Sequence, residues 1–74
     1  MDIRRQLGLN VQRLRREKDW SQEDLAFESG LHRTYISGIE RGIRNPTITI
    51  IAELAATLGV STGTLVDPPL RKSR

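Results

Sequence analysis

SQEDLAFESGLHRTYISGIERG, residues 21–42, predicts two short helices joined by a tight turn. Ser21 is expected to cap the first helix, because Asp24 follows three positions later and completes a Ser-x-x-Asp capping box. Trp20 precedes the cap and Leu25 lies one turn further on, a spacing that favours a hydrophobic staple between the two side chains. Trp20 is therefore expected to anchor the start of this helix.

Gly30 separates the two helices. Only glycine adopts the left-handed backbone conformation without steric cost, which suits the end of one helix and a sharp turn into the next. The first helix is expected to end near Ser29, and the second to extend from about Arg33 to Arg41, where Gly42 ends it.

The second of these helices has two different faces. Ile36 and Ile39 are three positions apart and are expected to point into a core. Four of the remaining side chains are polar or basic and are left for solvent or a ligand: Arg33, Thr34, Ser37 and Arg41. A helix of this kind, braced by the one before it, is typical of proteins that place a helix in the major groove of DNA. The alternative for these residues is an ordinary solvated surface.

The flanking segments also predict helices. From Asp2 to Lys18, apolar residues recur at helical spacing: Ile3, Leu7, Val11 and Leu14. Residues 43–46 are expected to form a loop. The run TITII, residues 47–51, is rich in β-branched residues and could form a strand.

Helix is favoured for this run, because Thr47 suits an N-cap and Gly59 a C-cap. The apolar residues between them keep helical spacing: Ile51, Leu54, Ala55 and Leu58. Ser61 is expected to cap a short fifth helix that reaches Val66. The sequence therefore predicts an all-α fold of five helices.

Chain length and composition set further limits. A chain of 74 residues has room for one domain with a modest core, so we expect a domain over residues 1–67, a basic tail over residues 68–74, and dimerisation. Twelve basic and nine acidic residues give a net charge of +3, and ten of the twelve are arginine, whose planar fork suits phosphates and base edges. This charge permits binding to nucleic acid without requiring it.

The composition also argues against several classes of protein. The absence of cysteine excludes disulfides, and with a single histidine no metal site or other cofactor is expected. Residues 1–10 contain no apolar run that suits a signal peptide or a membrane span, so we expect a cytoplasmic protein with no membrane partner and no small-molecule ligand. No nucleophile–base set and no glycine-rich phosphate loop is present, so an enzyme is not expected.

Residues 14–65 contain a series of short motifs in order: LRR, SQEDLA, Gly30, ISGIERG, NPT, LAATLGVS and Leu65. In this order and spacing the chain resembles the lambda-type phage repressors and Cro proteins, also called the XRE family. The motifs RTYISGIERG and RNP are most like those of the controller proteins of restriction–modification systems, which are small dimeric regulators. The resemblance implies a five-helix DNA-binding domain with its helix-turn-helix at the second and third helices.

Arg33 and Thr34 would stand at the end of the third helix that points at base edges in this motif. An arginine there donates two hydrogen bonds to guanine, a contact that discriminates between bases by about 1–3 kcal/mol. Thr34 offers a hydroxyl or a methyl group, and Ser37, one turn further on, would reach the next base or a phosphate. The resemblance to controller proteins also implies that these three residues lie at the DNA surface.

Other residues are expected at phosphates. Gln22 opens the second helix, where its amide and free backbone N–H groups suit a phosphate oxygen, as the resemblance also implies. Arg44 and Asn45, at the loop tip, would hold phosphates on the other side, and the alternative for Arg44 is an ordinary exposed charge. Tyr35 has two alternative roles: a contact to the DNA backbone, which the resemblance implies, or simple packing within the protein. Stacking on a base is the alternative to the anchoring role of Trp20.

Arg15 and Glu40 are expected to act structurally. A carboxylate on a DNA-facing helix would repel phosphates unless it is engaged, and the resemblance to phage repressors implies a salt bridge between these two residues that orients the recognition helix. His32 stands where the family often has a better N-cap, so the start of this helix is expected to be weakly capped, unless the neutral ring accepts a backbone N–H. A pH switch is the less favoured alternative for this residue.

Gly38 stands where some phage repressors use a long side chain against bases. Its small size implies less direct base readout and more reliance on DNA shape, and it permits a close approach of the backbone.

The resulting hypothesis is a transcription regulator that binds double-stranded DNA, at a near-palindromic operator, as a homodimer. The dimer surface is expected on the fourth and fifth helices, where several apolar residues have no evident place to be buried within one chain: Val60, Leu65, Val66 and Leu70. The alternative is an antitoxin or prophage repressor that acts partly through a protein partner.

Overall fold

The computed structural model describes residues 2–68 and forms five helices within them. These are α1 (Ile3–Glu17), α2 (Gln22–Ser29), α3 (Arg33–Glu40), α4 (Ile48–Leu58) and α5 (Thr62–Val66). The all-α prediction is confirmed, and the β-branched run after Thr47 is helical. None of the described helices is both long and apolar enough to span a membrane. Apart from Pro68, the expected tail over residues 68–74 lies outside the described part of the chain.

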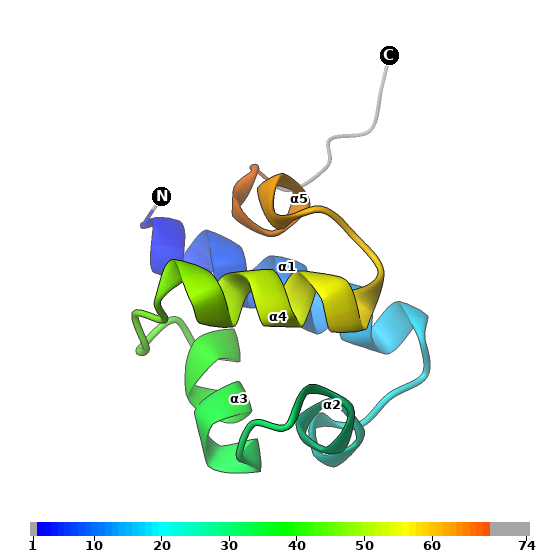
Figure 1. The fold of residues 1–74 in the computed structure, drawn as a ribbon. Coiled ribbons are helices and arrows are strands. Elements are labelled where there is room, and N and C mark those ends of the chain that lie inside the picture. Colours follow the sequence, from blue (N-terminus) through cyan, green and yellow to red (C-terminus); the bar gives the residue numbers. More distant parts are fainter. Residues whose placement is uncertain (1, 69–74) are drawn as a thin grey trace.

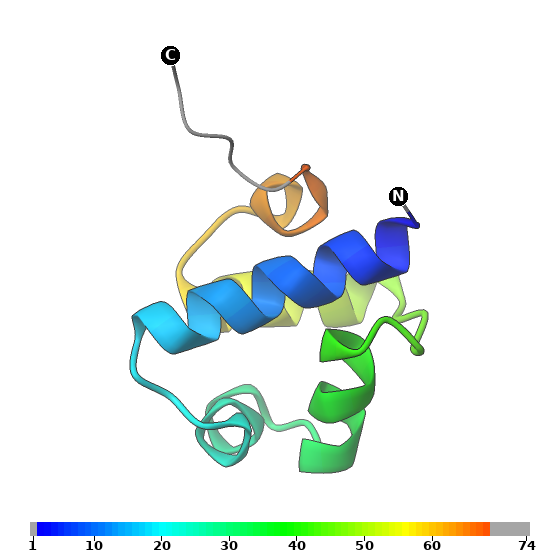
Figure 2. The same cartoon turned by 180° about the vertical axis from the view of Figure 1, so that it is seen from behind.

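The helices pack around α1 and α4, which lie one behind the other across the middle of the molecule (Figure 1, Figure 2). α5 packs against both of them on one side. α2 and α3 pack against each other on the opposite side, where α3 contacts α1 and α2 contacts α4. The predicted helix-turn-helix therefore forms one end of the molecule.

Short polar side chains begin four of the five helices, each by accepting a backbone N–H that has no partner within its helix. The Asp2 carboxylate and the hydroxyls of Ser21, Thr47 and Ser61 are these caps. At α2 the predicted capping box is complete: Ser21 Oγ accepts from the N–H of Asp24 at 3.0 Å, and the Asp24 carboxylate accepts from the N–H of Ser21 at 2.9 Å.

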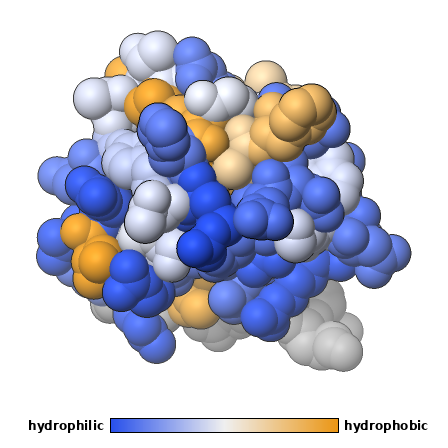
Figure 3. All heavy atoms as spheres, turned by 90° about the horizontal axis from the view of Figure 1, so that it is seen from below, coloured by the Kyte–Doolittle hydropathy of each residue, from blue (hydrophilic) through white to orange (hydrophobic). Residues whose placement is uncertain are grey.

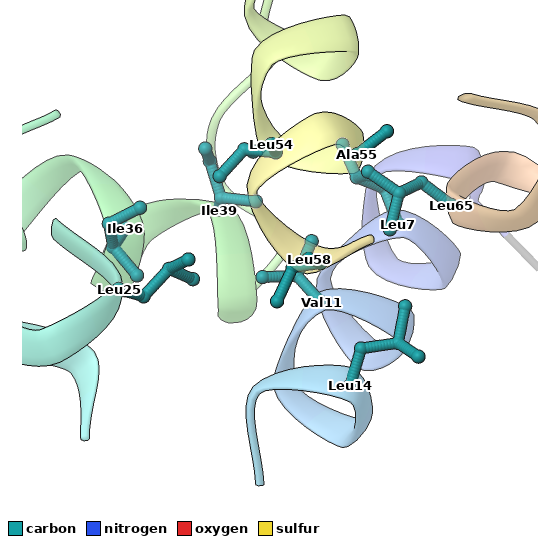
Figure 4. Close-up of a cluster of buried hydrophobic side chains, with 10 residues drawn as sticks. All are labelled: Leu7, Val11, Leu14, Leu25, Ile36, Ile39, Leu54, Ala55, Leu58 and Leu65. Atoms are coloured by element: carbon teal, nitrogen blue, oxygen red, sulfur yellow. The ribbon is translucent and has the colours of Figure 1, made fainter. Parts of the chain in front are cut away.

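The hydrophobic core draws side chains from every helix (Figure 4). Its members are Leu7, Val11, Leu14, Leu25, Ile36, Ile39, Leu54, Ala55, Leu58 and Leu65. Trp20 is half-buried against this cluster, as expected of an anchor for α2. Ile3 differs from its prediction: it remains 59% exposed, because the core reaches only from Leu7 to Leu14 along α1.

Leu65 corrects the prediction made for the dimer surface. Its side chain is fully buried within one chain, because α5 folds back onto α1 and α4 and inserts Leu65 between them. Val60 and Val66 are half-buried and stay available for an interface, and Leu70 lies outside the described residues.

Two amide side chains of α1, which the sequence did not single out, hold α5 in place. Asn10 is 1% exposed, and its Nδ2 donates to the carbonyls of Leu65 and Asp67, each at 2.8 Å. Gln6 Nε2 donates to the Val66 carbonyl at 2.7 Å. These bonds satisfy carbonyls at the end of a helix too short to be stable alone.

Candidate nucleic-acid interface

The turn between α2 and α3 has the predicted geometry. Gly30 ends α2 in the left-handed conformation, with a φ of 79°, and donates its N–H to the Ala26 carbonyl at 2.9 Å. An added Cβ at Gly30 would meet no neighbouring atom within 4 Å, so the backbone conformation, not space, is what requires glycine here. α3 begins three residues later at Arg33.

The outward face of α3 carries the predicted contact residues. Arg33 and Thr34 lie in its first turn and are exposed, and Ser37 is half-buried one turn further on. Ile36 and Ile39 are fully buried on the opposite face. Figure 3 views the molecule from the side of α2 and α3 and shows a largely hydrophilic surface that is interrupted by smaller hydrophobic patches. α3 thus presents polar and basic groups to solvent at its N-terminal end.

Glu40, at the other end of α3, is paired with Arg15 of α1. Arg15 Nε donates to Glu40 Oε2 at 2.6 Å, and Arg15 Nη2 donates to Glu40 Oε1 at 2.9 Å. The Arg15 side chain is only 8% exposed and that of Glu40 only 1%. The predicted ion pair is therefore present, in the two-pronged geometry that favours arginine–carboxylate pairs.

Two further hydrogen bonds complete this network. Gln22 Nε2 donates to Glu40 Oε1 at 3.0 Å, and Arg15 Nη1 donates to the Trp20 carbonyl at 2.8 Å. Burial would raise the pKa of Glu40, but the hydrogen bonds from Arg15 and Gln22 outweigh it and hold that pKa below its ordinary value. The negative charge at the end of α3 is neutralised, so it does not oppose an anionic ligand on the outward face.

Gln22 consequently has a partner that the sequence did not reveal. The prediction assigned its amide to a phosphate, whereas one amide hydrogen is donated to Glu40. A side-chain amide has two hydrogens, so the second remains available to a ligand. Glu40 holds the Gln22 side chain at the N-terminus of α2, where Gln22 lines a surface hollow together with Arg33 from the start of α3.

His32 is the N-cap residue of α3 and makes no side-chain cap hydrogen bond. The prediction of a weakly capped helix start is confirmed, and the idea that the ring accepts a backbone N–H is wrong. His32 is exposed. The first turn of α3 thus keeps its N–H groups free of any side-chain cap from this residue.

Arg44 and Tyr35 contact each other across the loop that follows α3. The Arg44 guanidinium carbon lies 5.3 Å from the centre of the Tyr35 ring, within the range of a cation–π contact. Tyr35 is half-buried, whereas Arg44 and Asn45 are exposed. Gly38 is buried, with the Arg44 side chain over it, so the prediction that Gly38 leaves α3 open to a close backbone approach needs correction.

Gly8 is a positioning residue that sequence reasoning missed. An added Cβ at Gly8 would overlap the Ile39 carbonyl and lie 2.7 Å from the Glu40 carbonyl oxygen. α1 and the end of α3 therefore cross with their backbones in close approach. A glycine in the middle of a predicted helix is the signal that could have pointed to this contact.

A family model described as helix-turn-helix matches residues 11–65, which is most of the chain. The chain belongs to this helix-turn-helix family. The matched range contains α2, the turn at Gly30 and α3 and reaches Leu65. The resemblance inferred from the sequence motifs is confirmed.

Named relatives of this helix-turn-helix protein are regulators. An uncharacterized helix-turn-helix-type transcriptional regulator of Sinorhizobium fredii is 50% identical over 68 residues, which cover 92% of this chain and 88% of the relative. The crystal structure of a hypothetical transcription factor from Neisseria is 44% identical, has a TM-score of 0.89, and matches 92% of this chain and 78% of that one. The restriction-modification controller protein C.Esp1396I, solved as a tetramer in complex with its natural 35-base-pair operator, is 40% identical, has a TM-score of 0.79, and matches 88% of this chain and 86% of that one.

Proposed function

We propose that this protein is a transcription regulator that recognises a near-palindromic DNA operator as a homodimer. The observation that carries the proposal is the distribution of charge along α3. Arg33 is exposed at the N-terminal end of the helix, while Glu40, at its other end, is buried and paired with Arg15. A similar controller protein was solved on its operator, which supports the same use of this fold here.

In this proposal α3 lies in the major groove and Arg33 donates to guanine O6 and N7. Thr34 contacts a neighbouring base through its hydroxyl or methyl group, and Ser37 reaches the next base or a phosphate. The exposure of Arg33 and Thr34 in the first turn supports this division.

The phosphates on either side are held by residues flanking α3. Gln22 uses its remaining amide hydrogen and the N-terminus of α2 on one side. Arg44 and Asn45 act on the other side, from the exposed loop, with Tyr35 beneath Arg44. These contacts fix the protein on the duplex without reading its sequence.

A homodimer is proposed because one helix contacts too few base pairs to specify a unique DNA site. Two copies about 34 Å apart double the number of base pairs that are recognised. The proposed interface lies on α4 and α5, with the half-buried Val60 and Val66 as its apolar centre. The domain would then extend over residues 1–67, with the basic tail beyond it, and act in the cytoplasm, where its operator is.

Among regulators of this family, a restriction–modification controller is the role we favour, because the motifs RTYISGIERG and RNP point to that group. An antitoxin or prophage repressor with a protein partner is the alternative. The genes beside its own decide between them: a methyltransferase and an endonuclease support the controller, and a toxin gene supports the antitoxin.

Selection of duplexes from a random DNA pool by the purified protein tests the function itself. We expect an enriched site with two related half-sites, bound with an affinity that falls steeply as salt rises, because binding releases counterions from the phosphates. Enrichment of no sequence, or an affinity that ignores salt, would contradict the proposal.

A further inference from the structure

Gly38 is an unfavourable residue for the middle of α3. Glycine is among the poorest helix formers, and α3 has only eight residues. Its backbone here is ordinary right-handed helix, since the positive φ angles in the described chain belong to other residues. A glycine at this position therefore needs an explanation outside its own backbone.

The side chain of Arg44 supplies that explanation. A Cβ added at Gly38 would lie 2.7 Å from Arg44 Cγ, 3.1 Å from Nε and 3.4 Å from Cδ. All three nearest atoms belong to this one side chain, and none is backbone. The gap left by the absent Cβ, which we call the Gly38 notch, is therefore filled by the stem of Arg44.

The stem leads the charged group of Arg44 along α3. Tyr35 precedes Gly38 by three positions, so the two share one face of the helix, with Tyr35 one turn nearer its N-terminus. The guanidinium carbon of Arg44 lies 5.3 Å from the centre of the Tyr35 ring. Arg44 thus extends from the loop over Gly38 to Tyr35, toward the end of α3 that carries Arg33.

We propose that Gly38 is a positioning residue for DNA binding: its notch holds Arg44 along α3, with the guanidinium over Tyr35, before a phosphate arrives. This inference rests on the proposed function and assigns Gly38 a role within it. A free arginine side chain loses much conformational freedom when it binds, and a held one loses less. The notch therefore raises affinity without contacting DNA.

Gly38→Ala tests the notch directly. We expect the affinity for a mixed-sequence DNA duplex at low salt to fall about threefold to tenfold, the effect of releasing one side chain that must be ordered on binding. The melting temperature is expected to stay close to that of the wild type, because alanine favours helix while the stem of Arg44 must move out of the notch. A much lower melting temperature would show that the methyl group displaces more than Arg44, and would overturn the proposal.

Arg44→Ala and the double variant separate the notch from a direct effect at Gly38. If Gly38 acts through Arg44, Gly38→Ala has no further effect on affinity once Arg44 is alanine. An equal loss in both backgrounds would mean that the methyl group itself obstructs DNA, and would overturn the proposal. The side-chain Nε–H resonance of Arg44 should also shift in Gly38→Ala, and an unchanged resonance would contradict the displacement.

The same titrations distinguish a failure of this inference from a failure of the proposed function. A wild-type protein that binds no duplex at low salt contradicts both. A wild-type protein that binds, with Gly38→Ala binding equally well, contradicts only the role of Gly38.

Discussion

Glu40 shows how a single buried acid serves the helix that we propose faces DNA. Its carboxylate accepts from Arg15 of α1 and Gln22 of α2, so one side chain joins α3 to the two helices that pack against it. The same pairing cancels a charge that would repel phosphates. Because both partners are almost completely buried, removing either leaves the other without its main partner in a region that excludes water.

Glu40→Ala is expected to lower the free energy of unfolding by about 3 kcal/mol, the cost of breaking a buried ion pair from one side. Urea unfolding followed by circular dichroism measures it. Glu53→Ala is the matched control, because Glu53 lies on an exposed position of α4. Equal stability of the two variants would show that the Glu40 ion pair does not stabilise the fold.

The pH dependence of stability provides a second test of this residue. The pKa of Glu40 is lower in the folded protein than its ordinary value of 4.5, so its contribution is fully present above that value and is lost as pH falls through the folded pKa. Glu40→Gln cannot titrate there. The stability difference between wild type and Glu40→Gln should therefore be constant near neutral pH and shrink in acid, and a difference that grows in acid would contradict the assignment.

At the scale of the elements, the position of α3 depends on how closely it approaches α1. The approach is closest at Gly8, where the carbonyls of Ile39 and Glu40 occupy the space of a side chain. The ion pair from Arg15 lies two turns further along α1 and fixes the same helix end. A backbone contact and a charged contact together set the direction in which α3 presents Arg33.

Gly8→Ala is expected to destabilise the protein by about 2 kcal/mol, because the atoms it meets are backbone and the two helices must separate. This loss exceeds the gain in helix propensity that alanine brings. Gly63→Ala is the control, since a Cβ there would meet only Ser61 Oγ, at 3.8 Å, and should not destabilise α5. Thermal unfolding compares the two, and a Gly8→Ala protein as stable as Gly63→Ala would show that the helices do not need this approach.

For the whole molecule, the central question is which apolar surface meets a second copy. Val60 and Val66 are half-buried near α5, whereas Phe27 of α2 is 82% exposed. In the proposed dimer α2 and α3 face DNA, which leaves α4 and α5 for the partner. The end of the molecule opposite the helix-turn-helix is therefore the expected interface (Figure 1).

Val60→Asp is expected to raise the dissociation constant of the dimer at least about tenfold, because a charge in an apolar interface must be desolvated. Sedimentation equilibrium measures it. Phe27→Asp makes the same kind of change on α2 and should leave the dimer intact. The opposite ranking would place the interface on α2.

The features that the sequence predicted are those set by neighbours along the chain. Caps such as Ser21, the turn at Gly30 and the inward face of α3 depend on residues a few positions apart, and the structure has them as expected. The features that were missed depend on distant partners. Asn10 bonds to carbonyls more than fifty positions away, and Leu65 is buried because α5 folds back onto α1, a return that spacing alone does not reveal.

In the candidate site, too, the contacts between distant residues could not be predicted from local patterns. The ion pair between Arg15 and Glu40 came from the family resemblance, not from spacing, and the structure has it. The path of Arg44 over Gly38 depends on how the loop after α3 folds back, so no local pattern predicted it. The predicted DNA contacts of Arg33 stay a prediction until a duplex is bound.

The central claim is that the start of α3 reads base edges in the major groove. Comparing the base preference of the wild type with that of Arg33→Ala tests this claim most directly. Wild type and Arg33→Ala are titrated against the selected operator and a set of single-base-pair variants at one salt concentration. If the start of α3 reads base edges, Arg33→Ala loses its preference at one base pair in each half-site, by about 1–3 kcal/mol, and keeps it elsewhere. A uniform loss of affinity across all variants would make Arg33 a phosphate contact and contradict the placement of α3 in the major groove.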